Sequence, residues 1–337
     1  MAEIVKNKKI LDVKDLRIYF HTDKGISKAV DGNSFRMYEN ETLAIVGESG
    51  CGKSVTAMSI LGLVDEPGKL EEGSQIMYGD LNLATASDNE RRAIRGNEIS
   101  MIFQEPMTSL NPVFKIGEQI QEAVLLHENI SKKEAKERAI EMLQLVGISR
   151  PERVVKDYPH QLSGGMRQRV MIAMALACNP KLLIADEPTT ALDVTIQAQI
   201  LSLMNDIKKK TGTSIMLITH DLGVVAQMAD TVNVMYAGKV VETAPVKQLF
   251  KSPKHPYTQG LMNSMPSLNT DGSRLNTIEG TVPNTLYLPK GCYFADRCPH
   301  AMDKCREKQP LNYKIASRHY TSCFLYENES LETKEEE

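Results

Sequence analysis

The sequence has no long apolar run and few cysteines. Its longest uninterrupted apolar stretch, Val170–Cys178, is far shorter than the roughly 20 residues of a membrane-spanning helix. The charged start of the chain, Met1–Lys9, has no apolar core of the kind that a secretory signal needs. Six cysteines in 337 residues are too few for a disulfide-stapled scaffold. We therefore expect no membrane span, no signal peptide and no disulfide framework.

An excess of charge of one sign is also missing. Lys and Arg total 40 against 43 Asp and Glu, which gives a net charge of −3. Because the chain has no broad basic field, nucleic acid is not an expected partner. Hydrophobic residues make up 42% and charged residues 25% of the chain, a globular balance that excludes disorder of the whole chain. The length fits two or three packed units.

Apolar runs that alternate with helical patterns predict an α/β core with a largely parallel sheet. Leu43–Val46 is apolar at every position, as in a strand that is buried on both faces. A turn at Asp23-Lys24-Gly25 is expected to separate the first two strands. The expected strands are Ile10–Phe20, Ser34–Met37, Leu43–Val46, Ile99–Phe103, Leu182–Ala185, Ser214–Thr219 and Thr231–Tyr236.

Two regions depart from this alternation. Residues 111 to about 179 have only helical patterns, so we predict a helical insert in the core. Within it, Ser131-Lys132-Lys133-Glu134 is a capping box that begins a helix, and Gly147 is expected to end that helix. After about Pro245, frequent prolines break up long elements and indicate an appended region.

Residues 47–54 match the phosphate-binding pattern G-x-x-x-x-G-K-S, between a predicted strand and a helical pattern. Glycines let backbone amides approach phosphate oxygens without a Cβ in the way. The helix that begins near Lys53 directs its positive end at the anion. Lys53 is predicted to reach the β- and γ-phosphates, and the Ser54 hydroxyl to hold Mg²⁺. The predicted nucleotide-binding stretch is Gly47-Glu48-Ser49-Gly50-Cys51-Gly52-Lys53-Ser54.

Two carboxylates, Asp186 and Glu187, follow the apolar run Leu182–Ala185. At the carboxyl end of a parallel strand they are expected to face the same crevice as the phosphate loop. Asp186 suits the Mg²⁺ shell, through water, and Glu187 suits the task of polarising an attacking water. Successive strand residues point apart, so adjacent acids can have separate roles.

The stretch Leu162-Ser163-Gly164-Gly165-Met166-Arg167-Gln168-Arg169 resembles the L-S-G-G-Q signature of the ATP-binding-cassette (ABC) ATPases. This stretch argues against a kinase, a GTPase or a helicase-like motor. The resemblance spans about Ile10–Val246 and implies a P-loop, RecA-like core with an N-terminal antiparallel β part. The predicted domains are a nucleotide-binding domain at 8–245 with a helical subdomain at about 111–179, a C-terminal extension at 246–325 and an acidic tail at 326–337.

The Ser-Gly-Gly stretch is predicted to be a second phosphate-binding site. A serine caps a helix start, two glycines leave the amides open, and the helix end is positive. The family resemblance implies that two subunits pair head to tail, so that each ATP also meets the partner's signature stretch. Met166 stands where the family has glutamine, and we expect little loss because this position does not supply the key amides. The residues implied to act in trans are Ser163, Gly164, Gly165 and Asp193, the last in the D-loop-like Thr190-Ala191-Leu192-Asp193.

The resemblance also implies roles within one subunit. Gln104 resembles the Q-loop glutamine and would join Ser54 and Asp186 around Mg²⁺. His220 resembles the switch histidine that contacts the γ-phosphate and would assist Glu187.

Phe20 resembles the aromatic residue on which adenine stacks. The alternatives are a strand-end polar residue for Gln104, a buried core histidine for His220 and core packing for Phe20.

Phe103–Pro112, the signature stretch and His255–Leu261 resemble the oligopeptide and dipeptide importer ATPases. This resemblance implies a peripheral subunit on the cytoplasmic face of the membrane. Its partners would be a distinct second ATPase, two transmembrane permease subunits and an extracytoplasmic peptide-binding protein, with no nucleic acid. The segment after Gln104 would receive the permeases' coupling helices.

Two alternatives stay open. One is a nickel importer ATPase of the same subfamily. The other is a soluble ABC ATPase that acts on nucleic acid or ribosomes, although the long coiled coils or paired cassettes typical of that class are absent.

Four cysteines crowd near the end of the chain with the spacing C-x5-C-x6-C-x17-C. Four thiolates suit an iron–sulfur cluster or tetrahedral zinc, and the C-x2–4-C pairs common in zinc sites are missing. The resemblance to peptide-importer ATPases implies a [4Fe–4S] cluster with a structural or sensory role, away from hydrolysis. Unligated structural cysteines are the alternative. The residues are Cys292, Cys298, Cys305 and Cys323.

Overall fold

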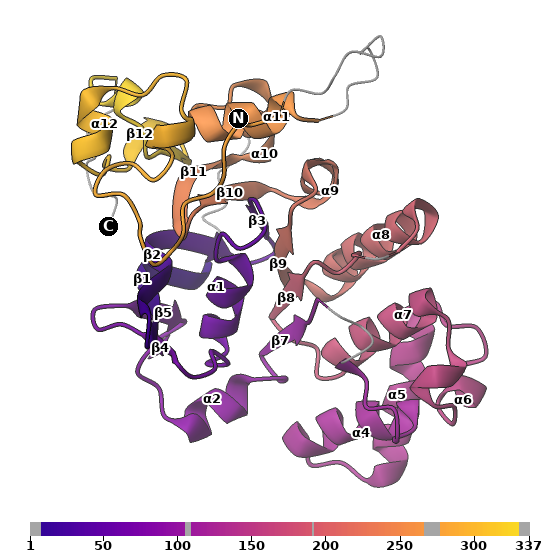
Figure 1. The fold of residues 1–337 in the computed structure, drawn as a ribbon. Helices are drawn as coiled ribbons and strands as arrows, with labels where there is room; N and C mark the ends of the chain where they lie inside the picture. The colour runs from indigo at the N-terminus through magenta and orange to yellow at the C-terminus, as the bar shows by residue number, and fades with distance from the viewer. Residues whose placement is uncertain (1–7, 105–108, 191, 266–276, 330–337) are drawn as a thin grey trace. The chain divides into compact units, whose positions relative to one another are not determined.

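The computed structural model describes residues 8–104, 109–190, 192–265 and 277–329 (Figure 1). These residues form two compact units, each assembled from separate stretches of the chain. The "loop unit" contains the predicted phosphate loop, and the "insert unit" contains the predicted helical insert. The loop unit spans residues 11–37, 42–84 and 219–337, and the insert unit spans residues 1–10, 38–41 and 85–218, within the described ranges.

The loop unit begins with a sheet of short and long strands in the order β2-β1-β5-β6, with β4 beside β1. β1 pairs antiparallel with β4 and β5, and β5 pairs antiparallel with β6. The expected N-terminal antiparallel part is thus confirmed. The strands are β1 (Lys9–Thr22), β2 (Gly25–Tyr38), β4 (Gly68–Leu70), β5 (Gln75–Tyr78) and β6 (Leu81–Asn82).

A second group of strands in the loop unit runs in the order β12-β13-β11-β10-β3. β3 and β10 are parallel, with Leu43 opposite Thr231, whereas β11 and β13 join antiparallel. The region after Pro245 therefore adds two strands to the sheet, which proline content alone did not predict. The strands are β3 (Thr42–Val46), β10 (Thr231–Tyr236), β11 (Lys239–Pro245), β12 (Tyr313–Ala316) and β13 (His319–Thr321).

The core of the loop unit joins the sheet to the C-terminal region. Tyr236 at the end of β10 is fully buried and packs its ring 4.6 Å from that of Tyr257 and 5.1 Å from that of Phe294. Aromatic side chains bury large areas, so the extension is held firmly on β10. The helices are α1 (Lys53–Ile60), α9 (Leu222–Met228), α10 (Val246–Lys251), α11 (Pro256–Asn263) and α12 (Asp303–Glu307).

The insert unit contains three parallel strands in the order β7-β8-β9. Every residue of β8 and β9 is buried, as their apolar sequences predict. β7 ends at Ile102, one residue earlier than expected, and Phe103 is 43% exposed. The strands are β7 (Ile99–Ile102), β8 (Leu182–Asp186) and β9 (Ser214–Thr219).

The predicted helical block is confirmed, and α4, α5, α6 and α7 gather together in Figure 1. α5 begins with the predicted capping box, in which Ser131 accepts from the Glu134 amide. Gly147 follows its end with a φ of +75°, a conformation that favours glycine. The helices are α2 (Asp88–Ile94), α4 (Ile116–His127), α5 (Lys132–Leu145), α6 (Pro151–Val154), α7 (Gly164–Ala175) and α8 (Val194–Thr211).

Over the described ranges, no helix combines the length and apolar content that a bilayer crossing demands. Three expectations fall on residues that the structure does not describe. They are residues 105–108 of the segment after Gln104, Ala191 of the D-loop-like stretch and residues 330–337 of the acidic tail.

Candidate functional site

The predicted phosphate loop connects β3 to α1 in the loop unit. A Cβ on Gly47 would lie 2.2 Å from the Met235 carbonyl oxygen, so only glycine fits against β10 at that position. Gly52 caps α1 with a φ of +98°, a conformation that residues with a Cβ rarely adopt. Ser49 and Gly50 at the tip of the loop are exposed. The chain thus forms the close turn that the motif requires and leaves its tip open.

Lys53 folds back over the loop that precedes it. Its ammonium donates to the carbonyl oxygens of Gly47 and Glu48 at 2.9 and 3.0 Å, and the residue is buried. Ser54, the next residue on α1, is half-buried. Burial raises the pKa of the Cys51 thiol, so this side chain stays neutral and packs beneath the loop.

The carboxylate of Glu187 lies at the centre of a polar cluster in the insert unit. Its Oε2 accepts from Gln104 Nε2 at 3.2 Å and from Thr190 Oγ1 at 2.9 Å. Glu187 has a φ of +46°, a region that is costly for a residue with a long side chain. Gln104, the predicted Q-loop residue, thus contacts Glu187, the predicted catalytic carboxylate. Thr190, predicted only as part of the D-loop-like stretch, contacts the same carboxylate.

Asp186 ends β8 and is only 4% exposed, whereas Glu187 is half-buried. The two adjacent acids therefore have different surroundings, as expected for side chains that point apart. Carboxylate, amide and hydroxyl oxygens are hard donors of the kind that Mg²⁺ takes. Asp186 and Gln104 of the insert unit and Ser54 of the loop unit each carry a donor of this kind.

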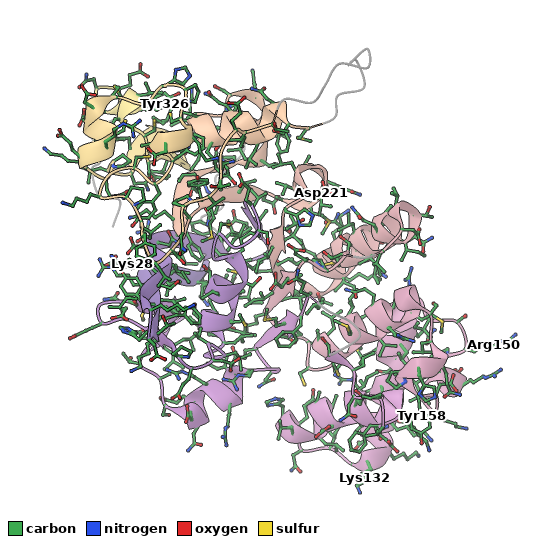
Figure 2. The ribbon with its side chains drawn as sticks, in the orientation of Figure 1. Lys28, Lys132, Arg150, Tyr158, Asp221 and Tyr326 are labelled. Atoms are coloured by element: carbon green, nitrogen blue, oxygen red, sulfur yellow. The ribbon has the colours of Figure 1, made fainter. Side chains whose placement is uncertain are left out.

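Ser163 caps α7, as predicted, and accepts from the Met166 amide at 3.4 Å. Ser163 and Gly164 are exposed, and a Cβ on Gly164 would meet open space. The backbone at the N-terminus of α7 is therefore accessible at Ser163 and Gly164. Tyr158, labelled in Figure 2, belongs to the turn that precedes this stretch.

The other predicted residues lie at element ends. Asp193 caps α8 by accepting from the Ile196 amide at 3.0 Å, and it is exposed. His220 follows β9 and is exposed, so the core-histidine alternative is wrong. Asp221 next to it, labelled in Figure 2, caps α9. The ring of Phe20 is half-buried on β1 opposite Gly68 of β4.

Two residues of the extension, which no sequence pattern had indicated, hold Glu48 in the phosphate loop. Arg297 pairs with the Glu48 carboxylate at 3.2 Å, and the Glu48 amide donates to the Tyr257 hydroxyl at 3.0 Å. The partners lie more than 200 positions apart in the chain, so no local pattern could have signalled them. Arg297 directly precedes Cys298 in the sequence, so a part of the extension next to one of the clustered cysteines contacts the phosphate loop.

A third link also joins the extension to the strand of Phe20. Asp31 on β2 accepts from Tyr19 and Tyr293 hydroxyls, each at 2.5 Å. Burial alone would raise the pKa of Asp31, but these hydrogen bonds and nearby Lys239 hold it below its ordinary value.

The four clustered cysteines line one cavity of about 10 Å³ in the loop unit, which is about the space of one water molecule. Burial raises the pKa of Cys292 and of Cys323 to about 11. Within the described ranges, no three His, Cys, Asp or Glu side chains are arranged as a metal-ligating group. The four thiols that line this cavity fit an iron–sulfur cluster by donor chemistry.

Comparison with known proteins identifies the family. A family described as ABC transporter matches residues 30–190, and one described as oligopeptide/dipeptide transporter, C-terminal region, matches residues 241–305. The oligopeptide transport ATP-binding protein AppD of Bacillus subtilis is 58% identical over 96% of this chain and 98% of its own length. The chain belongs to the ABC oligopeptide and dipeptide transport ATP-binding proteins.

Another relative and a solved structure are also similar to most of the chain. The dipeptide transport ATP-binding protein DppD of Bacillus subtilis is 52% identical over 94% of this chain and 95% of its own. A dimeric structure of the ATP-binding cassette MJ0796 bound to ADP and Pi is 28% identical with a TM-score of 0.63, over 70% of this chain and 98% of that one. The protein is therefore an ABC-type ATPase with the expected α/β P-loop fold.

Proposed function

We propose that this chain hydrolyses ATP to power the import of oligopeptides or dipeptides across the cytoplasmic membrane. The observation that carries the proposal is similarity above 50% identity to peptide transport ATP-binding proteins along nearly the whole chain, extension included. The named relatives are peptide transport proteins, which favours peptide over the nickel and soluble alternatives.

In this proposal residues 47–54 hold the phosphates of ATP. The open tip of the loop and the start of α1 supply amides, and Lys53 lies within the loop where it neutralises charge on the phosphates. Ser54, Gln104 and, through water, Asp186 would hold Mg²⁺. When bound, it supplies positive charge that stabilises the transferring phosphoryl group. Phe20 stacks on adenine.

Glu187 orients and polarises the attacking water. Gln104 and Thr190 both donate to its Oε2, which fixes the orientation of the carboxylate. Positioning of this kind is the main protein contribution to phosphoryl transfer. His220, exposed between β9 and α9, contacts the γ-phosphate and assists.

A second subunit completes each ATP site. Ser163, Gly164 and Gly165 of one subunit, with Asp193, meet the nucleotide held by the other. Three of these four residues, Ser163, Gly164 and Asp193, are exposed, as a docking surface requires. The dimeric MJ0796 cassette bound to ADP and Pi supports a paired arrangement, and we infer that the partner is a distinct homologue.

The remaining partners are two transmembrane permeases and an extracytoplasmic peptide-binding protein, with the chain peripheral on the cytoplasmic face. Exposed apolar side chains flank the segment proposed to receive the permeases. Phe103 is 43%, Val113 71% and Phe114 51% exposed. Neighbouring exposed apolar groups mark interaction surfaces.

The test is Glu187→Gln in the assembled transporter. The variant keeps the size of the side chain and its contact with Gln104, so Mg·ATP should still bind. Loss of the carboxylate should lower ATP turnover and peptide uptake by about 10²–10³-fold.

The matched control is Glu98→Gln, which alters an exposed carboxylate paired with Lys181 at 2.9 Å in the same unit. It should leave turnover unchanged. Normal turnover by the Glu187 variant would remove this residue from the reaction, and ATP turnover without peptide uptake in the unmodified transporter would refute peptide import.

We also propose that Cys292, Cys298, Cys305 and Cys323 hold a [4Fe–4S] cluster. The four line one cavity, and cluster iron takes four thiolates. The cluster would serve as a structural or sensory element. Protein purified without oxygen should show a broad visible absorbance band with stoichiometric iron and sulfide. Zinc alone in such protein would overturn the assignment, and metal-free protein would leave the cysteines structural.

A further inference from the structure

Arg297 of the extension forms an ion pair with Glu48 of the phosphate loop, within the loop unit. Its Nη1 donates to both carboxylate oxygens of Glu48 at 3.2 Å. The Arg297 side chain is only 7% exposed, and that of Glu48 is 30% exposed. A pair shielded from water to this degree is weakened less by solvent than an ordinary surface salt bridge.

The guanidinium of Arg297 also contacts two backbone carbonyls and an aromatic ring. Its Nε donates to the Glu279 carbonyl at 2.9 Å and its Nη2 to the Ile278 carbonyl at 3.1 Å. Its carbon lies 5.6 Å from the centre of the Tyr236 ring, at cation–π distance. An arginine fixed by so many contacts is a rigid anchor, because little side-chain freedom is left to lose when it binds Glu48.

Glu48 is in turn fixed at its backbone. Its amide donates to the hydroxyl of Tyr257, which is fully buried on α11. Its carbonyl accepts from Lys53 Nζ at 3.0 Å and from the Cys51 amide at 3.3 Å. A continuous chain of contacts therefore runs from Arg297 through Glu48 to the lysine of the phosphate loop.

We propose that Arg297 is a positioning residue for ATP, which sets the affinity of the phosphate loop by fixing Glu48 and, through it, Lys53. The proposal rests on the phosphate-binding role proposed for residues 47–54. Arg297 does not touch the phosphates, because its guanidinium is occupied by Glu48 and by two carbonyl groups. Arg297 acts indirectly, by holding the backbone of the phosphate loop in its binding conformation.

The test measures Mg·ATP binding to the full chain by calorimetry, and ATP turnover in the assembled transporter. Arg297→Gln should raise the Kd and the KM for ATP about tenfold, the value of one charge-assisted contact. The turnover number at saturating ATP should change less than about twofold, since Glu187 and its partners are untouched. A merely structural residue would lower the yield or the Tm without this division between KM and kcat.

Glu48→Gln tests the same contact from the other side, on a residue at the surface of the loop. It should reproduce the loss of ATP affinity. The double variant should bind Mg·ATP no more weakly than either single variant, because each single variant already removes the Arg297–Glu48 ion pair. The matched control is Arg306→Gln, which breaks an exposed ion pair with Asp296 in the same extension and should leave the Kd unchanged.

Lys53→Ala separates this inference from the function on which it rests. If Lys53→Ala binds Mg·ATP normally, the phosphate-binding role of the loop is wrong. If Lys53→Ala loses binding while folded Arg297→Gln or Glu48→Gln retains the normal Kd, the loop binds ATP and the positioning role of Arg297 is refuted. An affinity loss that is additive in the double variant would also overturn it.

Discussion

Gln168 links the helix of the signature stretch to the strand end that carries Glu187. It lies on α7, is 1% exposed, and donates from Nε2 to the Pro188 carbonyl at 2.5 Å. Pro188 directly follows Glu187. Because buried polar groups need hydrogen-bond partners, loss of the Gln168 side-chain amide would leave the Pro188 carbonyl without this donor.

Gln168→Leu removes the donor and leaves a side chain of similar volume. The cost is then mainly a buried carbonyl without a partner, about 1–3 kcal/mol. We expect the free energy of unfolding to fall by about 2 kcal/mol, with a drop in Tm of several degrees. Urea titrations followed by circular dichroism, analysed by linear extrapolation, measure this difference.

Gln199→Leu is the matched control. Gln199 is exposed on α8 and accepts from Arg169 at 3.1 Å, so its loss should cost less than about 0.5 kcal/mol. If Gln168→Leu unfolds at the same urea concentration as the unmodified chain, or if the control loses as much, the reasoning about the buried amide fails.

Two further predictions concern the loop unit. Asp31→Asn should lower the unfolding free energy at neutral pH by about 1–3 kcal/mol, because the carboxylate accepts two tyrosine hydroxyls at 2.5 Å. Because folding lowers the pKa of Asp31, the stability that its carboxylate contributes is present above about pH 4 and should shrink as the pH falls below that value. Equal urea midpoints of the variant and the unmodified chain at pH 7 would contradict the prediction. Gly47→Ala would place a Cβ 2.2 Å from the Met235 carbonyl, so it should weaken Mg·ATP binding more than about tenfold. A folded Gly47→Ala variant that binds Mg·ATP with normal affinity would refute the steric argument.

The sequence by itself determined the features that depend on neighbours along the chain. The apolar run Ile215–Ile218 became the centre of a buried parallel strand, because a strand covered on both faces needs a nearly continuous apolar run. The capping box at Ser131 and the serine cap at Ser163 depend on atoms only three residues apart. The glycine pattern of the phosphate loop also predicted its turn, since a close backbone approach and a positive φ need glycine locally.

Only the tertiary structure decided which distant residues meet. It brought Gln104 to Glu187, Arg297 to Glu48, and four cysteines to one cavity. It also showed that the proline-rich extension supplies strands to the sheet and contacts to the phosphate loop. Such pairings follow from how the sheets and helices pack, and packing depends on the sum of many weak contacts that no short stretch of sequence contains.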